Sequence, residues 1–229
     1  MVIKLDKFWE SHYKDKKKYE HLTLVDLRYR YIKKCIQNKG KILDLGFGTG
    51  YFLKKLSEDE FETYGFDLPR KNIGKISKQF SKKIKLNFGR IKNLPYQNSF
   101  FDYVISSEVF EHLTKKEMIL AFKKIYGMLK KEGKLIITVP SNENLIQNYM
   151  ICPYCSKEFH PFLHKQSFDK NYLIKFGYKM GFRKIHIIPF LTFLDFFYRL
   201  PFGLRFLISQ LSVISKILKP SYILAIFEK

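Results

Sequence analysis

The stretch that most constrains this chain is KILDLGFGTGYFL, residues 41–53. An apolar run ends in three glycines at alternate positions, Gly46, Gly48 and Gly50, and an amphipathic segment follows them. The pattern predicts a buried strand, a tight turn and the start of a helix, because glycine permits sharp turns and close approach of a ligand to the backbone. A helix N-terminus offers unpaired N–H groups and a positive dipole end, which suits an anionic group such as a carboxylate.

By itself the glycine turn has two interpretations. Its spacing is G-x-G-x-G, whereas the dinucleotide-binding fingerprint is G-x-G-x-x-G. An ordinary turn between a strand and a helix, without a ligand, is the simpler alternative. The segments that follow the turn therefore decide between the two.

Alternating strands and helices follow the glycine turn. After the first strand we expect further strands over 63–66, 84–88, 99–105 and 134–139. Helices are expected over 51–58, 70–80 and 115–129, with Thr114 as the N-cap of the last. Because alternation of this length favours parallel pairing with right-handed crossovers, the predicted fold class is α/β.

Asp67 stands at the end of the second predicted strand, about 20 residues past the glycine turn. A carboxylate in this position can accept hydrogen bonds from the two vicinal hydroxyls of a ribose. The alternative is that Asp67 caps the helix expected over 70–80. The first interpretation makes the glycine turn part of a nucleoside-binding site.

Four segments in this order resemble the motifs of the class I S-adenosylmethionine-dependent methyltransferases that act on small molecules. LDLGFGTG resembles their first motif and YGFDLP their ribose-binding segment, NLPYQNSFFDYVISSEVFEHL their long strand-four motif, and GMLKKEGKLIITVP their strand-five motif. The resemblance covers residues 42–140, with weaker likeness from His164 to the C-terminus. It implies a Rossmann-like seven-stranded, mostly parallel sheet with helices on both faces and an antiparallel last strand. The apolar runs 182–188 and 222–227 would supply strands six and seven.

The resemblance also implies S-adenosyl-L-methionine as the cofactor. The donor site would comprise Asp44, Gly46, Phe47, Gly48, Gly50, Asp67, Leu68, Ile91, Asn93 and Leu94. One position departs from the family: an acid that contacts the adenine amine often follows the glycine after strand three, and here Arg90 follows Gly89. Arginine cannot accept a hydrogen bond. The adenine would then be held by a backbone carbonyl, by Asn93, or by packing on Ile91 and Leu68.

Three candidate catalytic residues, Glu108, Glu111 and His112, follow the fourth strand, at the end where open α/β sheets place ligands. Methyl transfer from a sulfonium mainly requires alignment, and a base helps if the acceptor is a hydroxyl or a protonated amine. Histidine, with an ordinary pKa near 6.5, suits that role. The E-x-x-E-H pattern also resembles the quinone-pathway O-methyltransferases, in which these residues can bind a divalent metal. A structural role, with the histidine bonded to backbone, is the third alternative.

A second constellation has the pattern C-x2-C-x4-H-x3-H and comprises Cys152, Cys155, His160 and His164. The cysteines have zinc-knuckle spacing and the histidines finger-like spacing, but the gap between the pairs is too short for a helix that reads nucleic acid. We therefore predict a small structural zinc clip. The alternatives are reduced thiols and a metal-free histidine near the substrate cleft, since HKQSF at 164–168 resembles the family's H-x-x-x-F segment.

The 229 residues carry a formal net charge of +21, which raises the question of an anionic partner. The lysines are spread along the chain without one long run, and no RNA-binding motif is present. The charge is therefore interpreted as compositional, with nucleic acid and anionic membrane surfaces as alternatives. The expected partner is a small-molecule acceptor.

Three cysteines cannot make a disulfide framework, and the N-terminus has no apolar segment typical of a secretory signal. A cytoplasmic location is expected. The apolar stretch 189–219 contains no run of about 18 uncharged apolar residues, so a membrane-spanning helix is not expected. It predicts either an interfacial helix or lid over a lipidic substrate, or a helical insertion packed on the domain or in a dimer interface.

These expectations divide the chain into four parts. They are a helical cap over 1–40, a donor-binding core over 41–140, an insertion with the zinc clip and a helix over 141–181, and C-terminal strands with an apolar helical insertion over 182–229. The predicted function is methyl transfer to a small molecule that is quinone-like, lipid-linked or a sugar. An RNA or protein methyltransferase and a non-catalytic module that binds an adenosyl ligand or a membrane surface are the alternatives.

Overall fold

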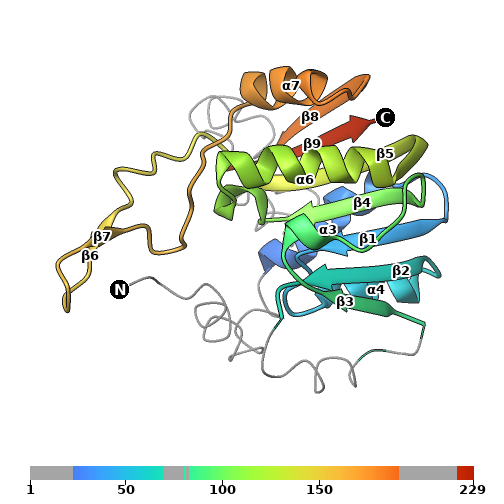
Figure 1. Cartoon of the computed structure of the whole chain (residues 1–229), viewed down its shortest axis with the longest axis horizontal. Coiled ribbons are helices and arrows are strands. Elements are labelled where there is room, and N and C mark those ends of the chain that lie inside the picture. The colour runs from blue at the N-terminus through green and yellow to red at the C-terminus, as the bar shows by residue number, and fades with distance from the viewer. Residues whose placement is uncertain (1–22, 70–79, 81–82, 191–220) are drawn as a thin grey trace, which may run out of the picture.

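A seven-stranded sheet forms the centre of the computed structural model, which describes residues 23–69, 80, 83–190 and 221–229 (Figure 1). The strand order is β3-β2-β1-β4-β5-β9-β8. The first five strands pair in parallel, whereas β9 is antiparallel to both of its neighbours. This is the mostly parallel sheet with an antiparallel last strand that the sequence predicts. The strands are β1 (Lys41–Leu45), β2 (Glu62–Asp67), β3 (Lys85–Phe88), β4 (Phe101–Ser107), β5 (Leu129–Pro140), β8 (Lys184–Phe190) and β9 (Tyr222–Glu228).

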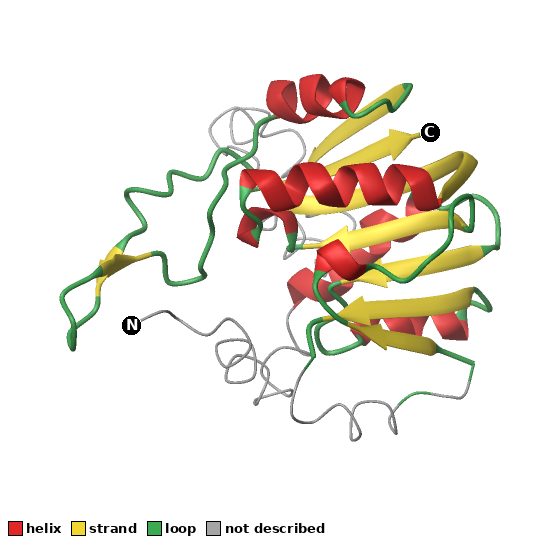
Figure 2. Cartoon of the chain, in the orientation of Figure 1, coloured by secondary structure: helices red, strands yellow, loops and turns green. Residues whose placement is uncertain are grey.

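Helices cover both faces of this sheet (Figure 2). One face carries α6 (Lys115–Met128) and α7 (Lys170–Lys179), and the other carries α3 (Thr23–Lys34) and α4 (Tyr51–Glu58). A small hairpin of two strands projects from this body (Figure 1). The smaller elements are the hairpin strands β6 (Met150–Ile151) and β7 (Glu158–Phe159) and two 3-10 helices, η1 (Ile91–Asn93) and η2 (Phe110–His112).

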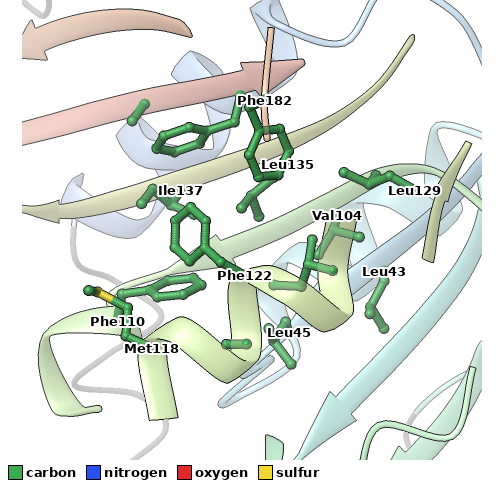
Figure 3. Close-up of a cluster of buried hydrophobic side chains, with 14 of the residues drawn as sticks. Leu43, Leu45, Val104, Phe110, Met118, Phe122, Leu129, Leu135, Ile137 and Phe182 are labelled. Carbon is green, nitrogen blue, oxygen red and sulfur yellow. The ribbon is translucent and has the colours of Figure 1, made fainter. Parts of the chain in front are cut away.

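The larger apolar core lies between the sheet and α6 (Figure 3). Phe122 of α6 is 1% exposed, and its ring lies 5.1 Å from that of Phe110 in η2 and 4.8 Å from that of Phe176 in α7. These three rings tie together α6, α7 and the turn after β4. The position of η2, which carries two of the candidate catalytic residues, therefore depends on the packing of this core.

The opposite face of the sheet is closed by α3 and α4. Ile32 of α3 and Leu56 of α4 are fully buried against Ile42 and Ile105 of the sheet. Helix α3 precedes the glycine turn in sequence. Its packing on the sheet brings it close to the end of β4, where its Arg28 pairs with Glu108. The part of the predicted helical cap that the structure describes is thus one layer of the fold.

Local sequence signals locate most boundaries correctly. Helix α6 starts after Thr114, whose hydroxyl accepts a hydrogen bond from the Glu117 N–H while the Glu117 side chain accepts one from the Thr114 N–H. The largest difference is at β5, which begins at Leu129, whereas the glycine at 133 predicts a start at Lys134. The reason is tertiary, because Leu129 is fully buried and pairs with Phe101 of β4.

Three expected segments lie wholly or largely outside the described residues. They are the first half of the N-terminal cap, the helix over 70–80 and the apolar stretch 189–219. Within the residues that the structure does describe, no helix combines the length and the apolar character needed to cross a membrane.

Candidate functional site

A cavity of about 400 Å³ opens where β1, β2 and β4 end. Its size is within the range of sites for small ligands, and its position is where open α/β sheets place them. The lining residues from these strand ends include Leu45, Gly46, Asp67, Glu108 and Val109. The cavity therefore brings the glycine turn and the segment after β4 into one site.

The glycine turn has a backbone that only glycine adopts easily. Gly46, Gly48 and Gly50 all have positive φ angles, of 80°, 53° and 83°. A Cβ on Gly46 would lie 2.4 Å from Cγ2 of Val109, closer than real atoms approach. The turn therefore packs directly on Val109, after β4. Glycine at position 46 is required by this contact as well as by the backbone of the turn.

Asp67 at the end of β2 holds this turn in place. One carboxylate oxygen accepts a hydrogen bond from the Gly48 N–H at 2.8 Å, and the other accepts one from the Leu68 N–H at 2.6 Å. Asp67 also lines the cavity. The carboxylate is thus held in a fixed orientation at the cavity by two backbone N–H groups.

The other predicted donor-site residues occupy three kinds of position. Leu68 and Ile91 line the cavity with Gly46 and Asp67. Phe47 and Leu94 are buried in apolar clusters, and Asn93 is exposed. Asp44 is 2% exposed in β1, and burial, followed by the charge of Asp67, holds the pKa of its carboxyl well above the usual range.

Glu108 is held in an ion pair that crosses the fold. Its Oε2 lies 3.2 Å from Nη2 of Arg28 in α3, and its Oε1 accepts a hydrogen bond from the Thr138 hydroxyl at 3.0 Å. Both ion-pair partners are largely buried. Burial raises the pKa of the Glu108 carboxyl, while the Arg28 guanidinium and the Thr138 hydroxyl oppose that rise. The residue also has a positive φ of 56°, a costly backbone for a non-glycine residue.

Glu111 and His112 lie together in η2. His112 lines the cavity, and its Nε2 is 3.9 Å from Oε1 of Glu111. The Glu111 side chain is 1% exposed, and neither carboxylate oxygen has a hydrogen-bond partner in the described part of the chain. Burial, followed by the charge of Glu108, holds the pKa of Glu111 well above the usual range.

The structure divides the predicted zinc ligands between two places. Cys152 and Cys155 lie in the turn of the projecting hairpin, where the Cys152 N–H donates to the Lys157 carbonyl at 2.9 Å. His160, which follows β7, is buried. Among the described residues, neither cysteine has its sulfur in a group of three ligand atoms within 4.8 Å of one another. The four residues are therefore not assembled into a single clip.

Both histidines instead face Glu143, in the loop after β5. Nε2 of His160 lies 3.2 Å from one Glu143 oxygen, and Nδ1 of His164 lies 2.5 Å from the other. Burial of His164 lowers the pKa of its imidazole, an effect that the hydrogen bond and charge of Glu143 partly oppose. The histidines are thus part of the strand-end region rather than of the hairpin.

Two residues of this region were not predicted as site residues. Glu143 lies three residues beyond β5, so the polar run SNEN after that strand was a usable signal. Arg28 lies in α3, 80 residues before its partner Glu108, and its role follows from no local pattern. Tertiary packing alone places that guanidinium at the end of β4.

Residues 43–137 match the family described as "Methyltransferase domain". The chain is similar to an uncharacterized methyltransferase of Anoxybacillus flavithermus, with 32% identity over 95 residues, 42% of this chain and 44% of that protein. It is also similar to the ubiquinone/menaquinone biosynthesis C-methyltransferase of Wigglesworthia glossinidia brevipalpis, with 33% identity over 149 residues, 59% of this chain and 58% of that protein. The chain spans about half the length of the curated relatives it matches.

Solved structures extend the likeness of fold to nearly the whole chain. A SAM-dependent methyltransferase from Archaeoglobus fulgidus has a TM-score of 0.66 and 21% identity, covering 90% of this chain and 93% of that one. The 1,6-didemethyltoxoflavin-N1-methyltransferase of Burkholderia thailandensis has a TM-score of 0.67 and 12% identity, covering 98% of this chain and 87% of that one. Residues 43–137 thus match a methyltransferase domain, and the fold of the chain is that of solved S-adenosylmethionine-dependent methyltransferases. The family resemblance predicted from the four sequence motifs is thereby confirmed.

Proposed function

We propose that this protein transfers a methyl group from S-adenosylmethionine to a small-molecule acceptor. The observation that carries the proposal is that Gly46, Asp67 and His112 line one cavity. Gly46 and Asp67 have the features of a nucleoside site, and His112 adds a titratable group. Such a cavity can align two reactants, which is most of what methyl transfer from a sulfonium requires.

The donor end fits the cofactor in residue type and in geometry. The Asp67 carboxylate is fixed by two backbone N–H groups and would accept hydrogen bonds from the ribose hydroxyls. Gly46 would allow the amino-acid part of the donor to approach the backbone, because no Cβ stands in the way. Bound S-adenosylmethionine would supply the electrophilic methyl group.

The adenine end differs from the usual family pattern. Ile91 and Leu68 line the cavity with apolar side chains, and Arg90 lies between Gly89 and Ile91 without an acceptor to offer. We propose that the adenine packs between Ile91 and Leu68 and that its amine is bound by a backbone carbonyl. In this arrangement, apolar packing on the adenine contributes more to the affinity for the donor than hydrogen bonds from side chains do.

The acceptor end would be served by His112. Its imidazole lines the cavity and can take a proton from an acceptor hydroxyl or amine. Oε1 of Glu111 lies 3.9 Å from Nε2 of His112, and the raised pKa of Glu111 favours a neutral carboxyl beside that ring. Glu108 is the least suited of the three predicted catalytic residues to act as a base, because its carboxylate is already bound by Arg28 and Thr138.

A quinone-like, lipid-linked or sugar acceptor is the finer part of the proposal. Its support is that two similar proteins named above are a ubiquinone/menaquinone C-methyltransferase and a didemethyltoxoflavin N-methyltransferase. A cytoplasmic location, with peripheral contact to membrane if the acceptor is lipid-linked, agrees with such a substrate. The apolar stretch near the C-terminus is the segment to delete when that contact is tested with anionic liposomes.

The donor site is tested by calorimetric titration with S-adenosylhomocysteine, with NADH as the ligand control. We expect micromolar binding of S-adenosylhomocysteine only, and a loss of about 100-fold in Asp67→Ala, since two hydrogen bonds to a charged group are removed. Asp169→Ala, which removes the exposed N-cap of α7, is the matched control and should bind normally. Absence of binding to the wild-type chain would overturn the proposal.

The net charge of +21 supports a second candidate, methylation of RNA. Such binding would weaken steeply with salt, because neutralising phosphates releases counterions. A titration of labelled RNA at two salt concentrations separates the candidates: salt-dependent binding in the micromolar range favours RNA, and weak binding at both favours a small molecule. A protein that binds the donor but methylates neither class of acceptor would be a non-catalytic binding module.

A further inference from the structure

A cluster of histidines and carboxylates lies beside the acceptor end of the cavity. The ligand atoms of Glu111, His112 and His164 all lie within 4.8 Å of one another. The rings of His112 and His164 meet edge to face, with centroids 4.8 Å apart. Methyl transfer as proposed uses only part of this cluster, and neither His164 nor Glu143 has a role in it.

Backbone hydrogen bonds hold the two halves of the cluster together. The Glu111 carbonyl accepts from the N–H of Lys165 at 2.7 Å and from that of Gln166 at 3.2 Å. The Gln166 side chain also donates to the Leu113 carbonyl at 2.9 Å. His164 therefore meets η2 through a fixed backbone arrangement and not through a chance contact of surface side chains.

Glu143 fixes the orientation of the His164 ring. Its carboxylate accepts the hydrogen bond from Nδ1 of His164, which leaves the lone pair of that imidazole on Nε2. A histidine that binds a metal nearly always donates its other ring N–H to a carboxylate, carbonyl or water. His164 has this outer partner already in place.

His160 has a different role, because its hydrogen bonds use the opposite nitrogen. Its Nδ1 accepts from the backbone N–H groups of Phe162 and His164, both at 3.3 Å, so its proton is on Nε2. That N–H faces the second oxygen of Glu143 at 3.2 Å. Since two backbone N–H groups already occupy the lone pair on Nδ1, His160 has none to offer an ion.

The Glu111 carboxylate independently points to a cation ligand in this cluster. It is almost fully buried, and no other described residue donates a hydrogen bond to either oxygen. An ionised carboxylate in such a place is costly unless a cation or hydrogen bonds compensate for lost water. Glu108, the other acid nearby, already has Arg28 and Thr138 as partners.

We propose that Glu111, His112 and His164 bind a divalent transition-metal ion, with Glu143 as the outer-shell residue that positions His164. Two imidazoles and one carboxylate are the ligands typical of catalytic zinc and of non-haem Fe²⁺ sites, which keep positions open for substrate or water. Metal bonds of about 2.0–2.2 Å bring ligand atoms to roughly 3.3 Å from one another, so modest side-chain closure would complete the site. Since His112 lines the cavity, the open positions would face the acceptor. With the ion bound, His112 would be a ligand and not the base of the proposed function, and the ion would take over the task of lowering the pKa of an acceptor hydroxyl.

The proposal is tested by metal content, which does not depend on methyl transfer. The full-length chain, purified without a histidine tag, is incubated separately with Zn²⁺, Fe²⁺ under anaerobic conditions, and Mg²⁺, then desalted and analysed for bound metal. We expect about one Zn²⁺ or Fe²⁺ per chain and no retained Mg²⁺. His164→Ala and Glu111→Gln should lose the ion, and Glu143→Gln should bind it about 10- to 100-fold more weakly.

Two controls make the result specific. His186→Ala removes an exposed histidine on β8, and the Cys152→Ser Cys155→Ser double variant removes both hairpin thiols. Both should retain the ion. Metal that is lost with the cysteines but kept in His164→Ala would overturn the proposal in favour of thiolate binding, and so would absence of metal from the wild-type chain.

Titration with S-adenosylhomocysteine shows whether each variant is folded, because His164, Glu111 and Glu143 do not line the cavity. Unchanged affinity in His164→Ala together with lost metal is the expected result. If the wild-type chain binds metal but no S-adenosylhomocysteine, the methyltransferase proposal fails and the metal site stands.

Discussion

The two ends of the cavity are built in different ways. The proposed donor end centres on the glycine turn after β1 and on Asp67 at the end of β2, which are joined by the pairing of these adjacent parallel strands and by the hydrogen bond from the Gly48 N–H to Asp67. The cluster at the other end draws on η2, on the loop after β5 and on the chain after β7, which meet only through tertiary packing. A locally encoded end of the cavity thus lies beside a cluster that depends on distant segments, and the two should respond differently to substitution.

Loss of core packing should separate the two ends most strongly. We expect Phe122→Ala to lower the free energy of unfolding by about 3–5 kcal/mol, because a large buried ring is replaced by a cavity. Since Phe110 packs on Phe122 and adjoins Glu111, the metal affinity of the folded fraction should fall more than its affinity for S-adenosylhomocysteine. Urea unfolding and the two binding titrations measure these effects.

Tyr178→Ala, which removes an exposed ring from α7, is the control for Phe122→Ala and should change stability by less than about 0.5 kcal/mol. Equal losses of both affinities in Phe122→Ala would contradict the separation of the two ends.

Removal of Arg28 tests the link between α3 and the end of β4. Arg28→Ala leaves the carboxylate of Glu108 buried without its ion-pair partner, and we expect a loss of about 3 kcal/mol near neutral pH. Arg30→Ala breaks an exposed pair with Asp26 on the same helix and should cost about 0.3–0.5 kcal/mol. Thermal unfolding of both variants gives the comparison, and similar losses would show that the buried pair has no special importance.

Two glycines with positive φ angles, Gly46 and Gly181, allow an effect at the proposed donor end to be distinguished from the effect of backbone strain alone. Gly46→Ala and Gly181→Ala both place a side chain at positive φ, which costs about 1–2 kcal/mol. Only the Cβ at position 46 would also meet Val109 and stand at the cavity. We expect S-adenosylhomocysteine binding to weaken about tenfold or more in Gly46→Ala alone, measured by calorimetry. Equal weakening in both variants would mean that general instability is the cause.

A smaller effect is expected from the dependence of stability on pH at Asp44. Its pKa is raised by burial, so its contribution to stability is present below the ordinary carboxyl pKa of about 4 and is lost as pH rises through the raised value. Asp44→Asn lacks that loss, so its stability relative to the wild type should increase with pH, by about 1 kcal/mol near neutrality. Melting temperatures of the ligand-free chain between about pH 4 and pH 8 measure the difference.

Asp59 should show the opposite dependence of stability on pH. Hydrogen bonds from Lys33 and Tyr29 lower the pKa of this surface carboxyl, so its contribution is present above the ordinary pKa and is lost as pH falls through the lowered value. Asp59→Asn should therefore lose a few tenths of a kcal/mol near neutral pH, since the pair is exposed to solvent. For Asp44, a stability advantage of Asp44→Asn over the wild type that shrinks as pH rises would contradict the raised pKa of its carboxyl.

The sequence by itself determined the sheet and the donor end. Three glycines at alternate positions require positive φ, Thr114 and Glu117 form a capping box, and apolar runs mark the first five strands, while the family resemblance implied the last two. These signals are local, because each depends on the backbone preference or hydrogen-bonding capacity of residues a few positions apart. The roles predicted for individual site residues remain predictions for the experiments above.

Only the tertiary structure decided how distant polar side chains pair. The sequence grouped His160 and His164 with two cysteines by spacing, whereas the fold directs both imidazoles to Glu143 and brings His164 to Glu111. It also pairs Glu108 with Arg28 from a helix that precedes the glycine turn. The physical reason is that a buried charge takes the partner that packing places beside it, and packing joins segments whose separation along the chain carries no signal.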